Sequence, residues 1–305
     1  MDGLILVRKP ESWTSHDVVA ALRNILGQKK IGHFGTLDPL ASGLLLTAVG
    51  KATRLFPLFG KLDKAYEARI RLGFSTDTYD AEGRPTSPET RTWPELESVR
   101  EALGGYQGKI MQDAPPFSAK KVKGKPLYAY ARANKSVEIR AFPVTIHAVR
   151  FRSYIPPDLD IHVRCSSGTY IRTLAHDLGR RLGCGAHLAG LVRTEVGDYR
   201  LEDAVSLDAI RAFHDGGRTD GFLRPMESLL SWLPKVVLNE TGAGLVKNGR
   251  PVGADSYASL APPSAACLRT PESLVRLFDP EGRWIALARP LEPDGATFAP
   301  TLVLL

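Results

Sequence analysis

The stretch that most constrains the fold is residues 31–43, a glycine-rich segment between two ordered patterns. It reads Ile-Gly-His-Phe-Gly-Thr-Leu-Asp-Pro-Leu-Ala-Ser-Gly, and its glycines and proline predict a loop of defined shape. Before it, Thr14-Ser15-His16-Asp17 opens an apolar stripe at helical spacing, which predicts a capped helix ending at Gly27. After it comes the apolar run 44–49. Loops held between rigid elements are where functional side chains tend to be placed.

Two further stretches alternate between apolar and polar residues. Residues 66–72 predict a strand whose apolar face carries Tyr66. Residues 159–165 alternate in the same way and run through a small-residue turn into an amphipathic pattern that stops at Gly183. This order puts Tyr170 and Arg172 at a helix N-terminus, which is a favourable place for an anionic ligand.

The texture of the chain changes after about residue 230. Short segments broken by glycine and proline end in an apolar run, the turn Asp279-Pro280-Glu281-Gly282 and a second apolar run, which predict a strand, a turn and a strand. We therefore expect an α+β fold with a first domain over 1–231 and a small β-rich domain over 232–305. The length of 305 residues suits about two domains.

Basic residues gather in one segment, which we call the basic arm (residues 117–140). The chain has a formal net charge of +7, which suits a polyanionic partner but is also common in proteins that bind none. The arm is either a solvated hairpin or an RNA contact, and interleaved aromatic rings favour RNA because bases stack on them. The expected contacts are Lys120, Lys121, Lys123, Lys125 and Tyr128.

Asp38 lies within the glycine-rich stretch. An acid there can be a nucleophile, a base, a metal ligand or a turn cap. No neighbouring acid, histidine or cysteine completes a metal site, and no nucleotide-binding motif occurs, so we expect neither metal nor cofactor. The N-terminus lacks the pattern of a signal peptide, and no stretch has the ~20 apolar residues of a membrane helix. These features predict a soluble, cytoplasmic protein.

The joint order of the motifs is more specific than any one of them. Residues 32–43 resemble the catalytic motif of the TruB-type pseudouridine synthases, with Phe34 and Ser42 as departures, and Arg8 departs from the family's acid before Lys-Pro. Other family motifs are matched in order across residues 3 to about 230. These are Lys9-Pro10 with Thr14-Ser15, Asp63-Lys64-Ala65-Tyr66 with residues 76–80, 115–124, 165–174 and 185–193.

The resemblance implies a pseudouridine synthase fold, with a mixed, mostly antiparallel sheet, flanking helices and a PUA-like C-terminal domain. It implies an isomerase that converts the T-loop uridine of tRNA, at position 55, to pseudouridine without a cofactor. The arm would be the family's RNA-gripping insertion. The base must be flipped out of the folded loop, which costs a few kcal/mol. We expect a monomer that needs no protein partner.

The resemblance also assigns roles to residues. Asp38 would be the catalytic carboxylate, and Arg172 its partner, which keeps it charged because a close arginine lowers an aspartate pKa by about 1–3 units. Tyr66 would stack on the flipped base and serve in proton transfer. The remaining expected substrate-binding residues are His33, Tyr170, Leu191, Lys9 and Asp80. Whether Asp38 attacks the sugar or the base is left open.

Three other readings are open. A pseudouridine synthase guided by RNA or acting on another RNA would share the fold, although the basic arm favours independent recognition of tRNA. A tRNA-binding folding helper would keep the binding surface and use its chemistry little or not at all. An unrelated basic α+β protein would match the motifs by chance.

Overall fold

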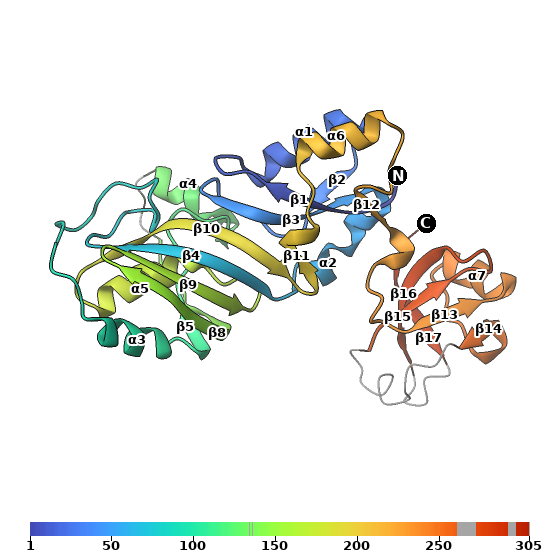
Figure 1. Ribbon diagram of the computed structural model, residues 1–305. Helices are drawn as coiled ribbons and strands as arrows, with labels where there is room; N and C mark the ends of the chain where they lie inside the picture. The colour runs from blue at the N-terminus through green and yellow to red at the C-terminus, as the bar shows by residue number, and fades with distance from the viewer. Residues whose placement is uncertain (134, 136, 261–272, 292–296, 305) are drawn as a thin grey trace.

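The computed structural model describes residues 1–133, 135, 137–260, 273–291 and 297–304. Its main feature is a ten-stranded sheet, followed along the chain by a separate five-stranded sheet (Figure 1). In spatial order, the main path of the larger sheet is β12 (Leu223–Pro225), β1 (Gly3–Lys9), β3 (Ala41–Val49), β10 (Ala186–Val196), β4 (Lys64–Leu72), β9 (Asp158–Cys165), β8 (Phe142–Ile155) and β5 (Gly108–Gln112).

All neighbours in the larger sheet are antiparallel except β3 and β10, which pair in parallel. Strand β2 (Ile31–His33) pairs with β3, and β11 (Tyr199–Arg200) pairs with β10. The parallel pair joins the two halves of the sheet, and it sets Leu191 of β10 opposite Ala41, just after the glycine-rich loop. The predicted mixed, mostly antiparallel sheet is therefore confirmed.

Helices flank this sheet at different places along its length. Figure 1 shows α1 and α6 together beside β1 and β3, and α3 and α5 beside β8, β9 and β4. The helices of the larger part are α1 (Ser15–Leu26), α2 (Phe56–Phe59), α3 (Leu96–Gly104), α4 (Leu127–Arg132), α5 (Ile171–Arg181) and α6 (Leu207–Asp215), with short 3-10 turns at Gly50–Leu55, Leu201–Asp203 and Met226–Ser228.

Helix α1 begins and ends as the sequence predicts. Thr14 and Asp17 form a reciprocal capping box, and Gly27 takes a left-handed conformation at φ 61° that lets the chain leave the helix. Its apolar side packs on one face of β1, while the alternate side chains of β1 enter a core on the other face. Strand β1 is therefore buried on both faces, and its last residue, Lys9, pairs with Gly43 at the end of the glycine-rich segment.

Helix α5 packs closely against β10. Gly179 makes this possible, because an added Cβ there would lie 2.1 Å from the backbone nitrogen of Ala186. The apolar face of the helix joins the buried face of β4, including Tyr66 and Ile70, in one core. The predicted strand over 66–72 and the helix that stops before Gly183 are both confirmed. Arg172, in the first turn of α5, is thereby directed toward the loop after β2.

The predicted loop over 31–43 is too long by several residues. Residues 31–33 form β2 and residues 41–43 belong to β3, so the irregular part is Phe34–Leu40. The reason is tertiary, because Ile31 pairs with Val49 and Gly43 lies against the backbone of Arg193. Gly43 has φ 104°, and an added Cβ would lie 2.4 Å from the Arg193 carbonyl oxygen. We call residues 34–40 the catalytic loop.

The C-terminal part is a five-stranded sheet with one helix. Its strands, in spatial order, are β14 (Tyr257–Leu260), β13 (Lys235–Leu238), β15 (Val275–Phe278), β16 (Trp284–Pro290) and β17 (Phe298–Val303), with α7 (Glu240–Lys247) and a 3-10 turn at Ala254–Ser256. The predicted strand, turn and strand are confirmed as β15 and β16, and the α+β class with them. The boundary between 231 and 232 stays a prediction, and residues 261–272, 292–296 and 305 of that span lie outside the described residues.

The two sheets share a core. Phe278 and Trp284 of the smaller sheet lie in the same apolar cluster as Leu4 and Phe59 of the larger part. The linker between the sheets is held by Arg276, a buried side chain that donates to the carbonyl oxygens of Glu227, Leu229 and Leu233. Among the residues that the structure describes, no helix is long and apolar enough to cross a membrane.

Candidate active site

The catalytic loop is tied down along its length. Ser15, the first residue of α1, accepts a hydrogen bond from the Leu37 amide at 2.8 Å, and its hydroxyl contacts the Leu37 carbonyl oxygen at 3.2 Å. Lys9 lies fully buried beneath the loop, where its ammonium donates to the carbonyl oxygens of Pro10, Trp13 and Pro39. Burial lowers the pKa of Lys9 to about 8. Lys9 thus orients the loop and does not line the cavity described below.

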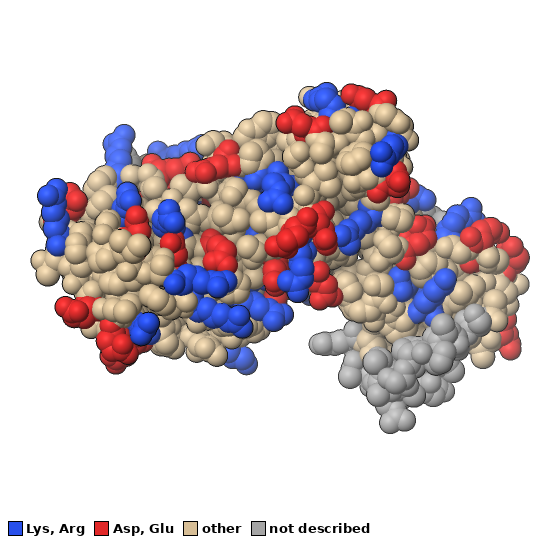
Figure 2. All heavy atoms as spheres, viewed as in Figure 1, with Lys and Arg blue, Asp and Glu red and all other residues tan. Residues whose placement is uncertain are grey.

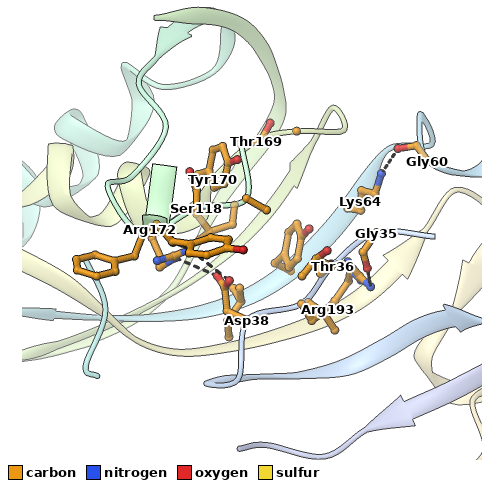
Figure 3. Close-up of a pocket in the computed structure, with 18 residues that line it drawn as sticks. Gly35, Thr36, Asp38, Gly60, Lys64, Ser118, Thr169, Tyr170, Arg172 and Arg193 are labelled. Carbon is orange, nitrogen blue, oxygen red and sulfur yellow. Dashed lines mark hydrogen bonds and ion pairs between the residues drawn. The ribbon is translucent and has the colours of Figure 1, made fainter. Parts of the chain in front are cut away.

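Asp38 is held by Arg172. The arginine Nε lies 2.9 Å from Oδ2 of Asp38, and its Nη2 donates to Oδ1 at 3.2 Å (Figure 3). Only 6% of the Arg172 side chain is exposed, whereas 39% of the Asp38 side chain is. The guanidinium is therefore fixed by the protein, and the carboxylate remains open to a substrate. The expected pairing of these two residues, 134 positions apart in sequence, is present in the structure.

Asp80 approaches Arg172 from the other side. Its Oδ2 lies 3.4 Å from Nη1 of the arginine, and only 4% of its side chain is exposed. The remaining Arg172 hydrogens go to the carbonyl oxygens of Thr78 at 3.2 Å and Phe117 at 3.0 Å. Asp80 thus belongs to the ion network and does not line the cavity. Phe117 is the first residue of the basic arm, so its bond to Arg172 joins the arm to this network.

Opposing effects act on the pKa of Asp38. Burial raises the pKa of Asp38, and the nearby Asp80 carboxylate acts in the same direction. The Arg172 guanidinium opposes both, but the pKa still lies above its ordinary value. Arg172 thus acts on the Asp38 pKa in the expected direction, while desolvation is the larger effect. An aspartate with a moderately raised pKa is still ionised at neutral pH.

A cavity of about 440 Å³ opens beside Asp38, which is the size of a small-ligand site. Tyr66, Tyr170 and Leu191 line it together with Asp38 and Arg172. Figure 3 shows Asp38, Tyr170 and Arg172 side by side there. The rest of the wall is Gly35, Thr36, Leu37, Gly60, Lys64, Phe117, Ser118, Ala119, Tyr128, Gly168, Thr169, Ile171 and Arg193. Among the described residues, no group of three or more His, Cys, Asp or Glu is placed to hold a metal ion.

Arg193 is a site residue that the sequence expectation missed. It is 1% exposed, and its guanidinium donates to the carbonyl oxygens of Leu44 at 2.8 Å and Gly35 at 3.1 Å, with Thr36 at 3.5 Å. From its place on β10, Arg193 therefore holds the start of the catalytic loop and the neighbouring strand β3 together. The available signal was its position in the motif over 185–193. Its residue type alone suits a surface arginine equally well.

Tyr66 and Lys64 come from the same strand as near neighbours. Burial raises the pKa of Tyr66, with the Arg193 guanidinium opposing it, so the phenol is neutral at neutral pH. Lys64 donates to the carbonyl oxygens of Gly60 at 2.9 Å and Leu62 at 2.6 Å, and burial lowers its pKa to about 8. Lys64 was also missed, because a lysine at the start of a strand usually reads as a solvated charge.

Tyr170 is fixed through its backbone. The buried amide of Gln112, on β5, accepts from the Tyr170 amide at 2.8 Å and donates to its carbonyl oxygen at 3.0 Å. These two hydrogen bonds fix the N-terminus of α5 and, with it, the backbone position of Arg172. Gln112 had no sequence signal, because its partner lies 58 residues away.

His33 ends β2 and does not line the cavity. Its Nδ1 is buried without a hydrogen-bond partner, and burial lowers the pKa of the imidazole. The ring is therefore neutral near pH 7. His33 directly precedes the catalytic loop, in the same segment as Asp38.

The basic arm is a hairpin followed by a short helix. Strands β6 (Lys121–Val122) and β7 (Lys125–Pro126) flank Lys123 and Gly124, both at positive φ, as in a tight two-residue turn. Lys121, Lys123 and Lys125 are exposed. Of the five expected RNA contacts in the arm, only Tyr128 lines the cavity, while Lys120 lies over the ring of Phe142.

The outward face of the larger sheet has a different character. Figure 2 shows basic and acidic side chains next to one another there. Arg69 pairs with Asp160 at 2.8 Å and Arg71 with Asp158 at 2.9 Å. Arg69 and Arg71 thus have acidic partners, unlike the lysines of the arm hairpin.

The fold and this site define the class of protein. The chain superimposes over 99% of its length on a chain from each of two solved complexes. A chain from a Cbf5–Nop10–Gar1 complex matches with a TM-score of 0.73 at 25% identity, covering 99% of this chain and 85% of that one. A chain from an H/ACA ribonucleoprotein bound to a substrate RNA containing 2'-deoxyuridine also matches with a TM-score of 0.73, at 24% identity and the same coverage. The fold is thus that of the pseudouridine synthases.

The sequence comparisons give the family. The N-terminal model of TruB family pseudouridylate synthases matches residues 23–171, and the C-terminal domain model of tRNA pseudouridylate synthase B matches residues 172–231. The tRNA pseudouridine synthase B of Aromatoleum aromaticum is 43% identical over 97% of this chain and 90% of its own length. That of Solibacter usitatus is 39% identical over 85% and 88%. The chain belongs to the TruB family and is a pseudouridine synthase, which confirms the resemblance seen in its motifs.

Proposed function

We propose that this enzyme converts the uridine at position 55, in the T-loop of tRNA, to pseudouridine. The relatives that carry the name tRNA pseudouridine synthase B span nearly the whole chain. The observation that carries the proposal is the Asp38 carboxylate, ion-paired to buried Arg172 and open to a cavity lined by Tyr66 and Tyr170. These rings offer apolar faces for a base, and the carboxylate offers the only acidic group of the cavity wall among the described residues.

The reaction is an isomerisation. The bond between uracil N1 and ribose C1′ breaks, a bond between uracil C5 and C1′ forms, the C5 proton leaves and N1 gains a proton. Atoms and electrons balance within the substrate, so the stoichiometry calls for no cofactor. Asp38 acts in its ionised form, whether its carboxylate attacks the sugar or the base. Arg172 orients that carboxylate with a two-point contact, which a lysine cannot reproduce.

The uridine reaches Asp38 only when it is flipped out of the T-loop. We assign Tyr66 to stack on the flipped base and to serve in proton transfer, with Tyr170 and Leu191 as the other walls. His33 would occupy the space that the base vacates. Two observations support this role for His33. It directly precedes the catalytic loop, and its lowered pKa keeps the ring neutral beside the bases.

The basic arm would grip the RNA around the cavity. Lys121, Lys123 and Lys125 are exposed on the hairpin, and Tyr128 joins the hairpin to the cavity wall. This continuity favours a stand-alone enzyme that acts as a monomer on tRNA without a guide or a protein partner. We further propose that residues 232–305 form a PUA-like RNA-binding domain after a catalytic domain over 1–231.

The test uses an unmodified tRNA transcript and the purified full-length protein. Pseudouridine is mapped by nucleotide, with Asp38→Asn run in parallel as an isosteric variant that lacks the charge. We expect product at position 55 only, and a rate loss of about 10²–10⁴-fold or more in the variant. A bare T-stem-loop should also be a substrate, because no guide RNA is involved.

Two outcomes would contradict the proposal. Product at another position or only in another RNA would assign the same chemistry to a different substrate. Tight binding of tRNA by a folded wild type that makes no pseudouridine would favour a folding helper. A filter-binding measurement on the same transcript separates these two outcomes.

A further inference from the structure

The turn that delivers Asp80 to the active site contains a backbone outlier. Tyr79 has φ 65°, in the left-handed region, which bulky residues rarely adopt. Such a conformation persists only where surrounding contacts hold it. The turn also carries hydrogen bonds of its own, from the Tyr79 amide to the Thr76 carbonyl oxygen and from the Thr76 hydroxyl to the Asp80 carbonyl oxygen. What holds the Tyr79 ring therefore bears on where Asp80 points.

The Tyr79 ring lies flat against His176 of α5. The ring centroids are 3.8 Å apart and the planes are inclined by 9°. The two rings are partly buried. Burial, aided by Arg180, lowers the pKa of His176, so the contact is between two neutral rings near pH 7. A close parallel contact of this kind fixes the ring of Tyr79 and, through it, the backbone of the turn.

Two side chains of helix α5, four residues apart, contact the turn that carries Asp80. Residues at i and i+4 lie on one helix face, and here they are Arg172 and His176. Arg172 donates to the carbonyl oxygen of Thr78 and lies 3.4 Å from the Asp80 carboxylate. His176 stacks on Tyr79, the residue between Thr78 and Asp80. Helix α5 carries Arg172, the partner of Asp38. The same helix thus also sets the position of Asp80, the second carboxylate beside Arg172.

The other side of the turn is held only through its backbone. The Leu188 amide of β10 donates to the Tyr79 carbonyl oxygen at 3.0 Å, and the Ala81 amide donates to the Leu188 carbonyl oxygen at 2.9 Å. These bonds fix the backbone on both sides of Asp80, and the Thr78 hydroxyl and the Glu82 amide donate to Oδ1 of its carboxylate. The ring stack adds a restraint on the Tyr79 side chain, which none of these bonds contacts.

From this geometry we propose that Tyr79 and His176 are positioning residues of the active site. Their stack holds Asp80 against Arg172 and so keeps the guanidinium aimed at Asp38. The proposal rests on the function proposed above, in which Asp38 and Arg172 carry the chemistry. Neither ring belongs to the cavity wall, so neither is expected to touch the RNA base.

The first experiment compares Tyr79→Gly with Tyr79→Phe in the full-length protein. Glycine accepts the positive φ and removes the ring, whereas phenylalanine keeps the ring and removes the hydroxyl. We expect the single-turnover rate on tRNA to fall roughly 10-fold in Tyr79→Gly, with the Kd for tRNA within about twofold of wild type. Tyr79→Phe should restore the rate. An unchanged rate in a folded Tyr79→Gly protein would overturn the proposal.

A double-mutant cycle tests whether Tyr79 acts through Asp80. If it does, Tyr79→Gly slows wild type roughly 10-fold but slows an Asp80→Asn protein by less than about twofold. Equal effects in the two backgrounds would mean that the ring acts elsewhere, which contradicts the proposal. The same cycle with His176→Ala should give the same pattern.

A crystal structure of Tyr79→Gly gives an answer that does not depend on turnover. We expect the contact between Asp80 and Arg172, 3.4 Å in the wild type, to be lost or lengthened. An intact contact would overturn the inference even if the rate falls. A wild type that makes no pseudouridine would reject the proposed function instead, and the structural comparison would still decide the role of the ring stack.

Discussion

The catalytic loop and the arm hairpin are two short irregular segments built in opposite ways. The loop over 34–40 is held by buried side chains from three distant elements, namely Ser15, Lys9 and Arg193. The hairpin over 121–126 is held by its own turn, and its lysines extend into solvent. Chemistry requires a carboxylate in one place, whereas an electrostatic contact with RNA tolerates movement. The predictions below test that contrast.

The largest effect is expected at the ion pair itself. Arg172→Lys keeps the positive charge but loses the two-point contact with Asp38 and the hydrogen bonds to Thr78 and Phe117. We expect the single-turnover rate to fall by about 10²-fold or more, with the Kd for tRNA little changed. Undiminished turnover would show that charge alone suffices at this position.

The next effect is expected where the loop is anchored. Arg193→Lys leaves a single point charge where three carbonyl oxygens of buried backbone are now bonded. The free energy of unfolding should fall by about 1–3 kcal/mol, and the rate should fall roughly 10-fold because the start of the catalytic loop is released. Denaturant titration and single-turnover kinetics measure the two. Arg276→Lys is the matched control: it removes similar bonds from the linker and should lower stability without slowing the reaction.

The arm should respond in the opposite sense. Replacing Lys121, Lys123 and Lys125 together by glutamine removes up to three phosphate contacts, so the salt dependence of log K should become shallower by up to about 2.7. We expect the Kd to rise roughly 10-fold at moderate salt, with the rate at saturating enzyme and the melting temperature unchanged. A slower step at saturation would mean that the hairpin also shapes the cavity.

The smallest effect concerns the pH profile. The pKa of Asp38 is raised by burial and by the Asp80 carboxylate, so its active ionised form is lost as pH falls through that raised value. Asp80→Asn removes the like charge, so the Asp38 pKa should drop and the acidic limb of the rate profile should move to lower pH. Single-turnover rates measured from pH 4 to 8 on both proteins provide the check. We expect the midpoint of the acidic limb to move by less than about one pH unit. A move to higher pH would mean that Asp80 acts mainly by holding Arg172.

The sequence by itself determined the elements and their order. Alternation placed β4 and β9, the capping residues and Gly27 placed both ends of α1, and the ordered motifs identified the family and pointed to Asp38, Tyr66 and Arg172. These signals are local or are carried by linear motifs, so they survive without a structure. The extent of the catalytic loop was overestimated because pairing of residues 31–33 with β3 depends on a partner beyond the loop.

Only the tertiary structure decided which charges are buried and what they contact. Lys9 was expected to bind substrate, and Arg193 and Gln112 look like ordinary polar residues in the sequence. Each of the three is enclosed and bonded to backbone from a remote segment. The raised pKa of Asp38 likewise follows from the enclosure by α5 and the Asp80 turn. Burial and long-range hydrogen bonds arise when strands distant in sequence become neighbours, and no local pattern records that event.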